Sequence, residues 1–569
     1  MARNARQLAR MSALLLIAAA FRLSGAAWDS GIGAHPDERY VVGIVGEMTR
    51  TSGLNPFAVD PSFPYGHVPL YLFLLVGGPD RLMAARLLTG ILDVGTVALT
   101  AALASLLAGA GDWPQGANRR SLAVPLAALF LTVMPLHVQQ AHFATADVPL
   151  AFFTTGALFF AAHWVRRPAQ GQAAFRLAAI CAGLAMGCKA GAALLLVPVA
   201  LAGALGAKGG RERALRAAEA LGLVLITFAL TNPFAVLEAH RFLSNVATQA
   251  ALARGAVLAP YTLQYRGTLP YLYPVAQQLV WGMGPVLGLL GFGGLAWSTV
   301  RAARGRLSLS EWVVLAWALP FFAFTGGLYL KFPRYLLPLT PVLAAYASQG
   351  WLEGGGGLRA LAPIYRYVCR TLSLLAVLPA GLLSLALVAS YGRPHPWVAA
   401  SEWIRAHLPP GSVIAVEEWD HPLPLDPSGY TLQVLPVFAP DGTEKEAVMG
   451  AILAEADAVV VASRRGYGAL ARWPDHFPQT RAYYRALFAG ERGWAAAGCW
   501  ARWPSLVGIV LADDPFGAAG LPLPHPDCRP GGLWLRLPHL DESWVVYDHP
   551  EVVVFVAQRE TTRPGSSVP

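Results

Sequence analysis

The chain has 569 residues, of which 55% are apolar and only 14% are charged, and its mean hydropathy is +0.45. Soluble domains contain about 45–50% apolar and about 25% charged residues, so this composition excludes a soluble globular protein. The apolar content also excludes a disordered chain, and five cysteines are too few for a disulfide scaffold. The class that remains is a polytopic α-helical membrane protein.

Apolar runs long enough to cross a bilayer, about 20 residues each, follow one another through the first two thirds of the chain. We predict eleven spans, several of them short or interrupted by Pro and Gly. They are centred on residues 11–28, 81–108, 122–138, 147–165, 173–188, 190–206, 214–231, 274–299, 310–328, 333–351 and 371–391. The first span also has the basic start and small-residue end of a signal peptide, but Arg22 interrupts its apolar run and favours a membrane anchor.

Lys and Arg gather in every second connection between these spans, as expected on the cytoplasmic side of a membrane protein. The six basic segments are residues 3–10, 119–120, 166–176, 208–216, 301–306 and 359–370. This alternation predicts a multi-pass plasma-membrane protein with its N-terminus in the cytoplasm and everything after residue 392 outside. The net charge of +9 then reflects topology, and we expect no nucleic-acid partner.

The first loop on the outer side, residues 29–66, contains the segment His35-Pro36-Asp37-Glu38 and then an amphipathic stretch. Pro36 and Asp37 are typical of a helix start. The apolar residues that fall on one side of this stretch are Val41, Val42, Ile44, Val45 and Met48. We predict a helix that lies on the membrane surface. Its carboxylate pair either only favours the helix dipole or carries chemistry.

A second acid on the same side of the membrane favours chemistry. Asp147 stands alone in a long stretch without other acids, and acids near lipid are costly and tend to be functional. Cations accompany it: Lys189 lies between two apolar helices, and Lys331 and Arg334 precede the tenth span. Each cation alone is explained by snorkelling to the interface, but acids and cations on one face predict a site for an anionic, membrane-borne ligand.

After residue 393, helix-like stretches alternate with short strand-like runs, which predicts an extracytoplasmic α/β domain. The helix-like stretches are residues 399–408, 444–454 and 479–489, and the strand-like runs are residues 412–417, 432–437, 458–462, 506–511 and 552–557. We therefore divide the chain into a transmembrane domain, residues 1–392, and an α/β domain, residues 393–569. An architectural role is the main expectation for the second domain, and sugar binding is the alternative.

Two pairs of cysteines have different expected roles. Cys181 and Cys188 lie in an apolar run and are predicted to be packing residues. Cys499 and Cys528 both lie in the α/β domain. They form a disulfide only if that domain faces an oxidising compartment, and both states stay open at this point.

Five segments resemble the GT-C fold glycosyltransferases that use polyprenyl-phosphate-linked sugars, which include protein O-mannosyltransferases and lipid A aminoarabinose transferases. These segments are residues 35–38, 65–71, 145–149, 188–191 and 334–338. The resemblance covers roughly residues 10–350 and not the α/β domain. It implies a GT-C-like helical domain and an enzyme that moves a sugar to an acceptor hydroxyl on the outer face of the membrane.

The resemblance also implies a role for individual residues. Asp37 would be the catalytic carboxylate, Glu38 would position the acceptor or support Asp37, and Asp147 would hold the acceptor or the sugar. Lys189 and Arg334 would stabilise the departing lipid phosphate. The other expected substrate-binding residues are His35, Tyr65, His67, His142, Lys331 and Tyr335. His67 stands where the aminoarabinose branch has a Lys before the Pro, which puts a phosphate-binding role for this position in question.

The expected chemistry needs a base on one side of the sugar and cations on the other, because displacement of the phosphate passes through an oxocarbenium-like state. A single base opposite the leaving group predicts inversion at the anomeric carbon. The predicted partners are the polyprenyl-phosphate-sugar donor, an acceptor protein, lipid or glycan, and membrane lipids. Cations already present make a metal unnecessary, although Asp37, Glu38 and Asp147 would be able to hold Mg or Mn.

Two other functions are alternatives. A polytopic transporter or lipid flippase would have acids near the middle of its spans and an internal repeat, and the sequence shows no repeat. A non-catalytic scaffold that presents the outer domain would not explain why charged residues gather in the other outer loops.

Overall fold

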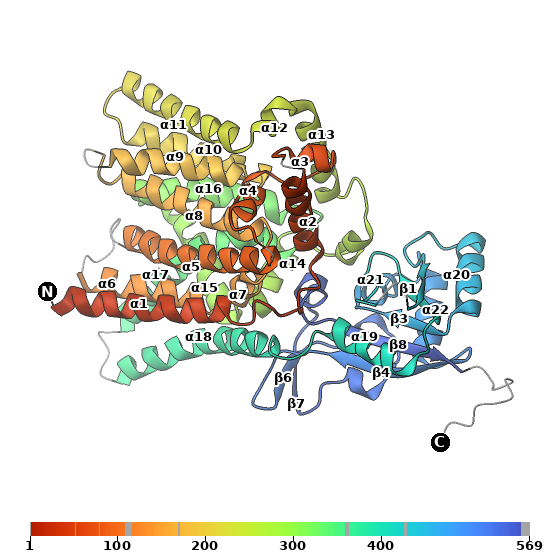
Figure 1. Cartoon of the computed structure of the whole chain (residues 1–569). Coiled ribbons are helices and arrows are strands. Elements are labelled where there is room, and N and C mark those ends of the chain that lie inside the picture. Colours follow the sequence, from red (N-terminus) through yellow and green to blue (C-terminus); the bar gives the residue numbers. More distant parts are fainter. Residues whose placement is uncertain are drawn as a thin grey trace, which may run out of the picture. The chain divides into compact units, whose positions relative to one another are not determined.

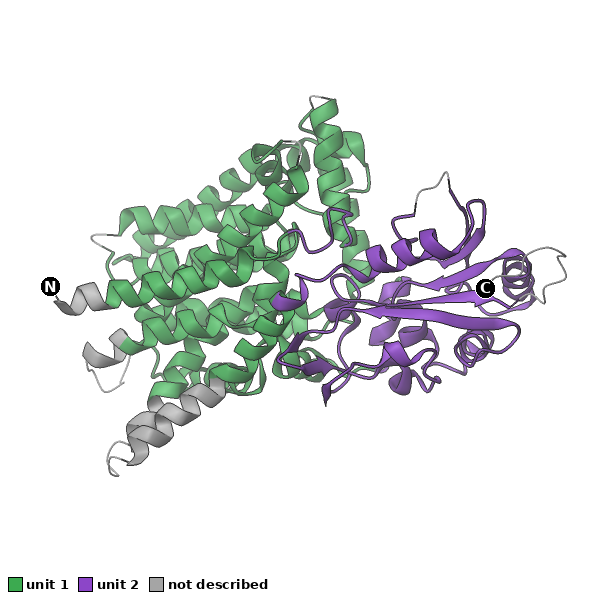
Figure 2. Ribbon diagram, turned by 60° about the horizontal axis from the view of Figure 1, so that its bottom comes forward, with its two compact units in different colours: residues 1–26, 35–257, 268–388 green, residues 27–34, 258–267, 389–569 purple. Residues whose placement is uncertain are grey.

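The computed structural model describes residues 2–51, 53–78, 80–108, 117–168, 171–358, 364–425 and 429–558. Arg359, which belongs to a predicted basic connection, lies outside these residues. The chain forms two compact units (Figure 2). Unit 1 comprises residues 1–26, 35–257 and 268–388, and unit 2 comprises residues 27–34, 258–267 and 389–569.

Unit 1 is helical, and many of its longer helices run side by side (Figure 1). Its first helices are α1 (Ala2–Leu23), α2 (Pro36–Arg50), α3 (Pro56–Val59), α4 (Val68–Leu75), α5 (Arg81–Leu107), α6 (Ala117–Thr132), α7 (Pro135–Ala141), α8 (Asp147–Trp164), α9 (Gln172–Met186), η1 (Ala190–Leu195) and α10 (Leu196–Leu205). The later ones are α11 (Gly210–Thr231), α12 (Pro233–Leu237), α13 (Ala239–Ala253), α14 (Leu272–Gln277), η3 (Gln278–Gly282), α15 (Pro285–Ala303), α16 (Leu309–Gly326), η4 (Pro333–Leu339), α17 (Thr340–Leu358) and α18 (Ile364–Ser390).

Four helices in the described part of the chain are long and apolar enough to cross a membrane, namely α5, α11, α15 and α16. Leu122–Thr132 of α6 and helix α7 pass the same test together, with a bend of 60° between them. The predicted number of eleven spans is therefore not confirmed. The chain becomes extended at Lys189, with φ −148° and ψ 136°, where two predicted spans meet, but the helices on either side, α9 with 15 residues and α10 with 10, are shorter than the test requires.

Small residues bring the helices of unit 1 close together. A Cβ atom added at Gly183 in α9 would lie 2.6 Å from the Cβ of Thr227 in α11. A Cβ added at Gly95 in α5 would lie 2.7 Å from the ring of Phe152 in α8. Such close helix contacts are typical of membrane proteins, where van der Waals packing drives helix association.

Unit 2 contains a mixed five-stranded sheet with the strand order β2-β1-β3-β8-β4. Strands β2, β1 and β3 are parallel, whereas β8 runs antiparallel to both β3 and β4. Its strands are β1 (Val413–Glu417), β2 (Thr431–Leu435), β3 (Ala458–Val461), β4 (Trp494–Ala501) and β8 (Glu551–Ala557), and a second sheet contains β5 (Ser505–Leu506), β6 (Ile509–Ala512) and β7 (Leu533–Arg536). The helical elements are η2 (Pro260–Tyr265), α19 (Pro396–His407), α20 (Thr443–Glu455), α21 (Arg465–Leu470), α22 (Pro478–Phe488), α23 (Pro515–Ala519), η5 (Pro526–Cys528) and α24 (Glu542–Val545).

The α/β character predicted for the C-terminal region is confirmed, with the predicted helices and strands present within a few residues of their expected bounds. The sequence analysis missed β4 and β7. The β4 segment Trp494–Ala501 contains four Ala and one Gly and no β-branched residue, so its composition does not favour a strand. Cys499 of β4 and Cys528 of η5 form a disulfide, with their Cα atoms 5.3 Å apart.

Candidate active site

Helix α2 begins at Pro36, as predicted, and carries Asp37 and Glu38 in its first turn. His35 is the N-cap residue, and its Nδ1 accepts a hydrogen bond from the Glu38 backbone N–H at 3.4 Å. Carboxylates in the first turn of a helix interact favourably with its dipole. The buried apolar residues on its inner face are Val41, Ile44, Val45 and Met48, so the position of Asp37 is fixed by packing of the helix that carries it.

Four charged side chains from distant parts of unit 1 form a connected series, here called the four-charge cluster: Lys189, Asp147, Arg334 and Asp37. Lys189 Nζ lies 2.6 Å from Asp147 Oδ1. Arg334 Nε lies 3.8 Å from Asp147 Oδ2, and its NH2 lies 2.9 Å from Asp37 Oδ2. The two side chains at the ends of the series, Asp37 at 29% and Lys189 at 24%, are the most exposed of the four.

Each member of the cluster stands at the end of a helix or at a break between helices. Asp147 is the first residue of α8, Arg334 lies in the short helix η4, and Lys189 occupies the extended residue between α9 and η1. The cluster therefore forms where several helix ends meet.

Two tyrosines lie beside the ammonium group of Lys189. Its Nζ is 5.9 Å from the ring centroid of Tyr65 and 5.6 Å from that of Tyr335, which is within the range of cation–π interactions. Burial and the nearby Asp37 carboxylate raise the pKa of Tyr65 well above its usual value. Tyr65 is therefore a neutral phenol at physiological pH, able to donate a hydrogen bond.

Two glycines allow the Tyr65 loop to approach Lys189. The Gly66 N–H donates to the Cys188 carbonyl at 3.2 Å, and the Val68 N–H donates to the Gly187 carbonyl at 3.0 Å. A Cβ at Gly66 would lie only 2.0 Å from the Gly187 carbonyl oxygen. This strand-like contact explains why a Gly is needed directly after Tyr65.

Glu38 occupies a different environment from Asp37. Its carboxylate is fully buried and accepts two hydrogen bonds from Arg86, at 2.8 Å from Nε and 2.5 Å from NH2. It also accepts a hydrogen bond from the Ala144 N–H at 2.8 Å. Arg86 in turn donates to the Ala26 carbonyl at 2.9 Å. The pair thus ties α2 to α5 and to the loop that leads to Asp147.

The remaining residues predicted from the sequence lie at different distances from this cluster. Tyr335 lies beside the cluster, with its ring centroid 5.6 Å from Lys189 Nζ, whereas Lys331 donates from Nζ to the Tyr329 carbonyl at 3.0 Å. His142 is buried, with Nδ1 2.7 Å from the Val138 carbonyl and Nε2 2.9 Å from the Ser24 carbonyl. The backbone therefore engages both of its ring nitrogens.

His67 lies in an aromatic environment. Its ring centroid is 5.4 Å from that of Phe57, 5.9 Å from that of Tyr71 and 6.2 Å from that of Phe234. Burial lowers its pKa to about 4, so the imidazole is neutral at physiological pH. In the described part of the chain neither ring nitrogen has a hydrogen-bond partner. A neutral ring is a poor substitute for the Lys found at this position in the aminoarabinose branch.

Sequence reasoning missed two buried charge networks of unit 1. The first is the Arg86–Glu38 pair. The second joins Asp93 to Arg22 Nε at 2.6 Å and to His137 Nδ1 at 2.7 Å, while His137 Nε2 lies 2.6 Å from the Thr340 hydroxyl. Charged residues within an otherwise apolar α5 were the available signal, because lone charges in a span need buried partners.

The three acids proposed to hold a divalent metal do not converge. Asp37 faces Arg334, Glu38 faces Arg86, and Asp147 faces Lys189. Among the described residues, no group of three His, Cys, Asp or Glu side chains is arranged to hold a metal ion. The donor set therefore does not fit a Mg or Mn site, and we derive no step through a metal.

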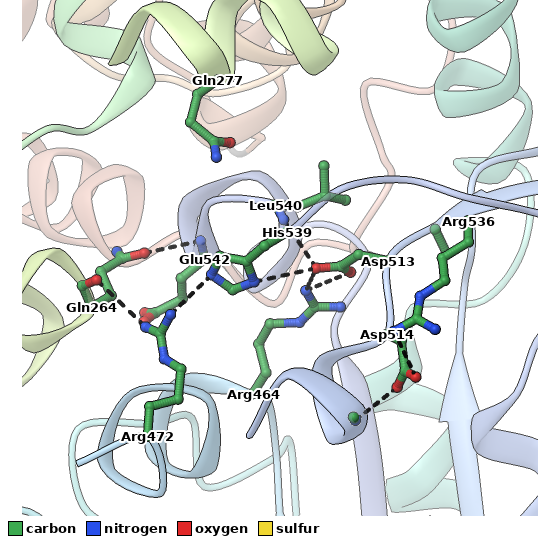
Figure 3. Close-up of polar contacts among 12 residues, drawn as sticks. Gln264, Gln277, Arg464, Arg472, Asp513, Asp514, Arg536, His539, Leu540 and Glu542 are labelled. Carbon is green, nitrogen blue, oxygen red and sulfur yellow. Dashed lines mark hydrogen bonds and ion pairs between the residues drawn. The ribbon is translucent and has the colours of Figure 1, made fainter. Parts of the chain in front are cut away.

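Unit 2 contains one set of buried charges that is closed on itself. Arg464 NH1 donates to Asp513 at 2.8 Å, and its Nε donates to Glu551 at 3.1 Å. Figure 3 shows Arg464 with Asp513, and beside them His539 and Arg472. We call Arg464, Asp513 and Glu551 the closed triad. Its three side chains are at most 3% exposed, so they are structural and not available to a ligand.

Comparison with known proteins relates this arrangement to a family. Residues 79–233 match the family model described as dolichyl-phosphate-mannose-protein mannosyltransferase. No curated protein is significantly similar to the chain in sequence. The resemblance of the chain to GT-C fold glycosyltransferases, predicted from the sequence, is confirmed over the matched segment.

Solved structures support the fold. The oligosaccharyltransferase of Archaeoglobus fulgidus in its apo form superposes with a TM-score of 0.50 at 16% identity, over 84% of this chain and 72% of that chain. Archaeal AglB from the same organism, in complex with an inhibitory peptide and a dolichol-phosphate, gives a TM-score of 0.52 at 15% identity over the same shares. ArnT from Cupriavidus metallidurans in the apo state gives 0.46 at 15% identity, over 81% of this chain and 93% of that chain. The two oligosaccharyltransferase structures show that the chain shares their fold, and together with its apolar helices this describes a multi-pass membrane protein.

Proposed function

We propose that the protein transfers a sugar from a polyprenyl-phosphate donor to an acceptor hydroxyl on the outer face of the plasma membrane, with Asp37 as the base. The four-charge cluster is the observation that carries the proposal. It combines one partly exposed carboxylate with two cations, which are the groups that this displacement requires.

Asp37 is the best base among the acids of the cluster. Its Oδ2 accepts a hydrogen bond from Arg334 at 2.9 Å. No described residue forms a hydrogen bond or an ion pair with its Oδ1. In the proposed step, Oδ1 takes the proton from the acceptor hydroxyl while the acceptor oxygen bonds to the anomeric carbon. The bond between that carbon and the phosphate oxygen breaks, and the electron pair leaves with the lipid phosphate. Attack from the side opposite the phosphate inverts the anomeric centre.

Lys189 and Arg334 stabilise the charge that develops on the leaving phosphate. Asp147 lies between them, 2.6 Å from Lys189 Nζ and 3.8 Å from Arg334 Nε, so one carboxylate holds both cations in place. Tyr65, whose pKa is raised by burial, is a further donor for a phosphate oxygen. Charge-assisted hydrogen bonds of this kind are the strong ones.

Glu38 supports Asp37 and does not contact the substrate in this proposal. The closed Arg86–Glu38 pair fixes the first turn of α2, from which Asp37 projects. His35 has the same role at the N-cap. In this way the buried Arg86–Glu38 pair fixes the position of Asp37, the partly exposed residue directly before Glu38.

The donor class is supported by the matching family model, whose description names dolichyl-phosphate-mannose, and by the AglB structure, which contains a dolichol-phosphate. The acceptor is a protein, lipid or glycan. The alternation of basic connections supports a cytoplasmic N-terminus and outward residues 393–569, and residues 1–392 carry the transferase. The transporter alternative is less well supported, because the matched family is one of transferases.

The test compares Asp37→Asn with Glu47→Gln, a change of the exposed carboxylate on the same helix. Membranes containing each variant are incubated with a radiolabelled polyprenyl-phosphate hexose and envelope acceptors, and sugar transfer is measured. Asp37→Asn should reduce transfer about 10²–10⁴-fold, as expected for loss of general-base catalysis. Glu47→Gln should not reduce it. Normal transfer by a membrane-inserted Asp37→Asn protein would refute the role of Asp37.

A further inference from the structure

Unit 2 contains a cavity of about 490 Å³ beside the disulfide. Its lining comes from the residues before α19 and the start of that helix, the end of β4, the following residues up to β6, and η5 with the segment after it. This volume lies in the range of small-molecule sites, about 300–1,000 Å³. No residue of the cavity belongs to the four-charge cluster, so a binding role for the cavity does not depend on the proposed function.

The cavity lining is positively charged. Arg393, Arg502 and Arg529 line it, and Asp527 is the acid among its lining residues. The Asp527 side chain is 72% exposed and lies 3.5 Å from His525. Solvent therefore screens its negative charge. The guanidinium groups therefore outnumber the carboxylates by three to one, which favours an anionic ligand.

Arg502 distinguishes this cavity from a chance depression in the surface. It is 1% exposed, and its guanidinium donates to the backbone carbonyls of Trp28 at 2.7 Å, of Arg393 at 2.9 Å, and of Asp548. Among the described residues no carboxylate forms an ion pair with Arg502, and its Nε has no hydrogen-bond partner. Asp548 and Asp29 offset part of its charge without pairing with it, and a buried charge without a direct ion pair is costly.

The pKa of Arg502 responds to this environment. Burial lowers it to about 10, although Asp548 acts in the opposite direction. The group is still protonated at neutral pH. Arg464, by contrast, is equally buried but contacts two carboxylates. An anion bound in the cavity would give Arg502 the counter-charge that the protein gives Arg464.

Aromatic side chains form the other part of the lining. Trp500 and Trp503 both contribute to it. Trp500 is half-buried and packs over Gly498, where a Cβ would lie 2.7 Å from the indole ring, and its ring centroid is 5.7 Å from that of Trp403. The ring is therefore held in one orientation. Flat apolar surfaces combined with a few fixed polar groups are typical of sites for ring-shaped ligands.

We propose that this cavity binds an anionic saccharide, meaning a sugar ring that carries a carboxylate or a phosphate group. The anionic group pairs with Arg502, Arg393 and Arg529, and the apolar face of the ring stacks on Trp500. Unit 2 is then a recognition domain and not only an architectural one. A neutral sugar lacks the charge for the first contact, and a free inorganic anion lacks the ring for the second.

Calorimetric titration of the detergent-solubilised full chain tests this proposal. The probes are sodium glucuronate, glucose 6-phosphate, glucose and inorganic phosphate. One of the two charged sugars should bind with a stoichiometry of one, and at least about tenfold more tightly than either glucose or phosphate. The two charged sugars distinguish a uronate from a sugar phosphate as the natural ligand chemistry. The proposal is overturned if neither charged sugar binds, or if inorganic phosphate binds as tightly as the charged sugars do.

Matched variants place the binding in the cavity. Arg529→Ala and Trp500→Ala should each weaken binding of the charged sugar about tenfold or more. Arg485→Ala, an exposed Arg in α22 outside the cavity, should leave it unchanged. Arg334→Ala should also leave it unchanged, which separates this site from the proposed active site. If Trp500→Ala does not fold, Trp500→Phe should retain part of the affinity. Unchanged binding in the folded Arg529 and Trp500 variants would overturn the proposal.

Discussion

The closed triad of unit 2 and the four-charge cluster of unit 1 arrange their charged residues in different ways. In unit 2, Arg464 is enclosed by Asp513 and Glu551, and all three side chains are nearly inaccessible. In unit 1, the four-charge cluster is open at both ends, where Asp37 and Lys189 remain partly exposed. A closed set of charges satisfies itself and stabilises the fold, whereas an open set leaves groups available for a substrate. Within unit 1, adjacent Asp37 and Glu38 illustrate both cases.

The largest effect on stability is expected at the closed triad. Arg464→Leu leaves Asp513 and Glu551 buried without their cation, which should lower the free energy of unfolding by about 3–5 kcal/mol. Chemical denaturation of the full chain, followed by proteolysis of unit 2, measures this loss. Arg485→Ala is the control and should change stability by less than about 0.5 kcal/mol. An equally small effect of Arg464→Leu would mean that the triad is not structural.

A substitution at the open end of the cluster should act on binding instead. Lys189→Ala removes a charge-assisted contact to the lipid phosphate, worth about 1.5–3 kcal/mol, so the dissociation constant for undecaprenyl phosphate should rise about ten- to a hundredfold. Stability should change less than in Arg464→Leu, because Arg334 still lies 3.8 Å from the buried Asp147 carboxylate. Lys208→Ala, at an exposed Lys, serves as control. Loss of stability with unchanged lipid binding would place Lys189 among the structural charges.

Unit 2 should also lose stability in acid as His395 becomes protonated. Burial and, less strongly, Arg502 lower the pKa of His395 to about 3. Its Nδ1 accepts the Trp397 N–H at 3.2 Å, and its Nε2 lies 3.0 Å from the Tyr547 carbonyl, so the ring is held neutral.

The unfolded chain binds this proton near pH 6.5, while the folded chain binds it only near pH 3. The stabilisation is therefore complete above pH 6.5 and is lost as the pH falls, by up to about 1.4 kcal/mol per pH unit. His395→Asn keeps an N-cap acceptor and should remove this part of the slope between pH 6 and 4. Denaturation at several pH values measures it, and an unchanged slope in the variant would contradict the assignment.

The smallest effect is expected for an exposed pair. Arg50 and Glu47 form an i,i+3 ion pair in which both side chains face solvent. Exposed pairs contribute about 0–1 kcal/mol, so Glu47→Gln should change the free energy of unfolding by less than about 0.5 kcal/mol and leave sugar transfer intact. A larger loss of unfolding free energy or of sugar transfer would show that solvent exposure does not distinguish dispensable charges from structural or functional ones in this protein.

Local signals in the sequence predicted a substantial part of the fold. Pro36 and Asp37 fixed the start of α2, and the apolar spacing from Val41 to Met48 identified its buried face. Short apolar runs predicted most strands of unit 2, but not β4, which is rich in Ala and has no β-branched residue. The predicted number of spans is not confirmed, because in the described residues only four helices and one bent pair are long and apolar enough to cross a membrane.

The sequence by itself determined the class of protein, the helix that carries Asp37, and the kinds of charged group at the proposed site. The tertiary structure decided which of them meet. Arg334 and Asp37 are separated by 297 residues along the chain, and Arg86 and Glu38 by 48. It also decided which carboxylate stays accessible, since Asp37 and Glu38 are indistinguishable in a local pattern. The physical reason is that pairing and desolvation depend on neighbours supplied by other helices, whereas helix propensity, capping and hydrophobic periodicity are properties of adjacent residues.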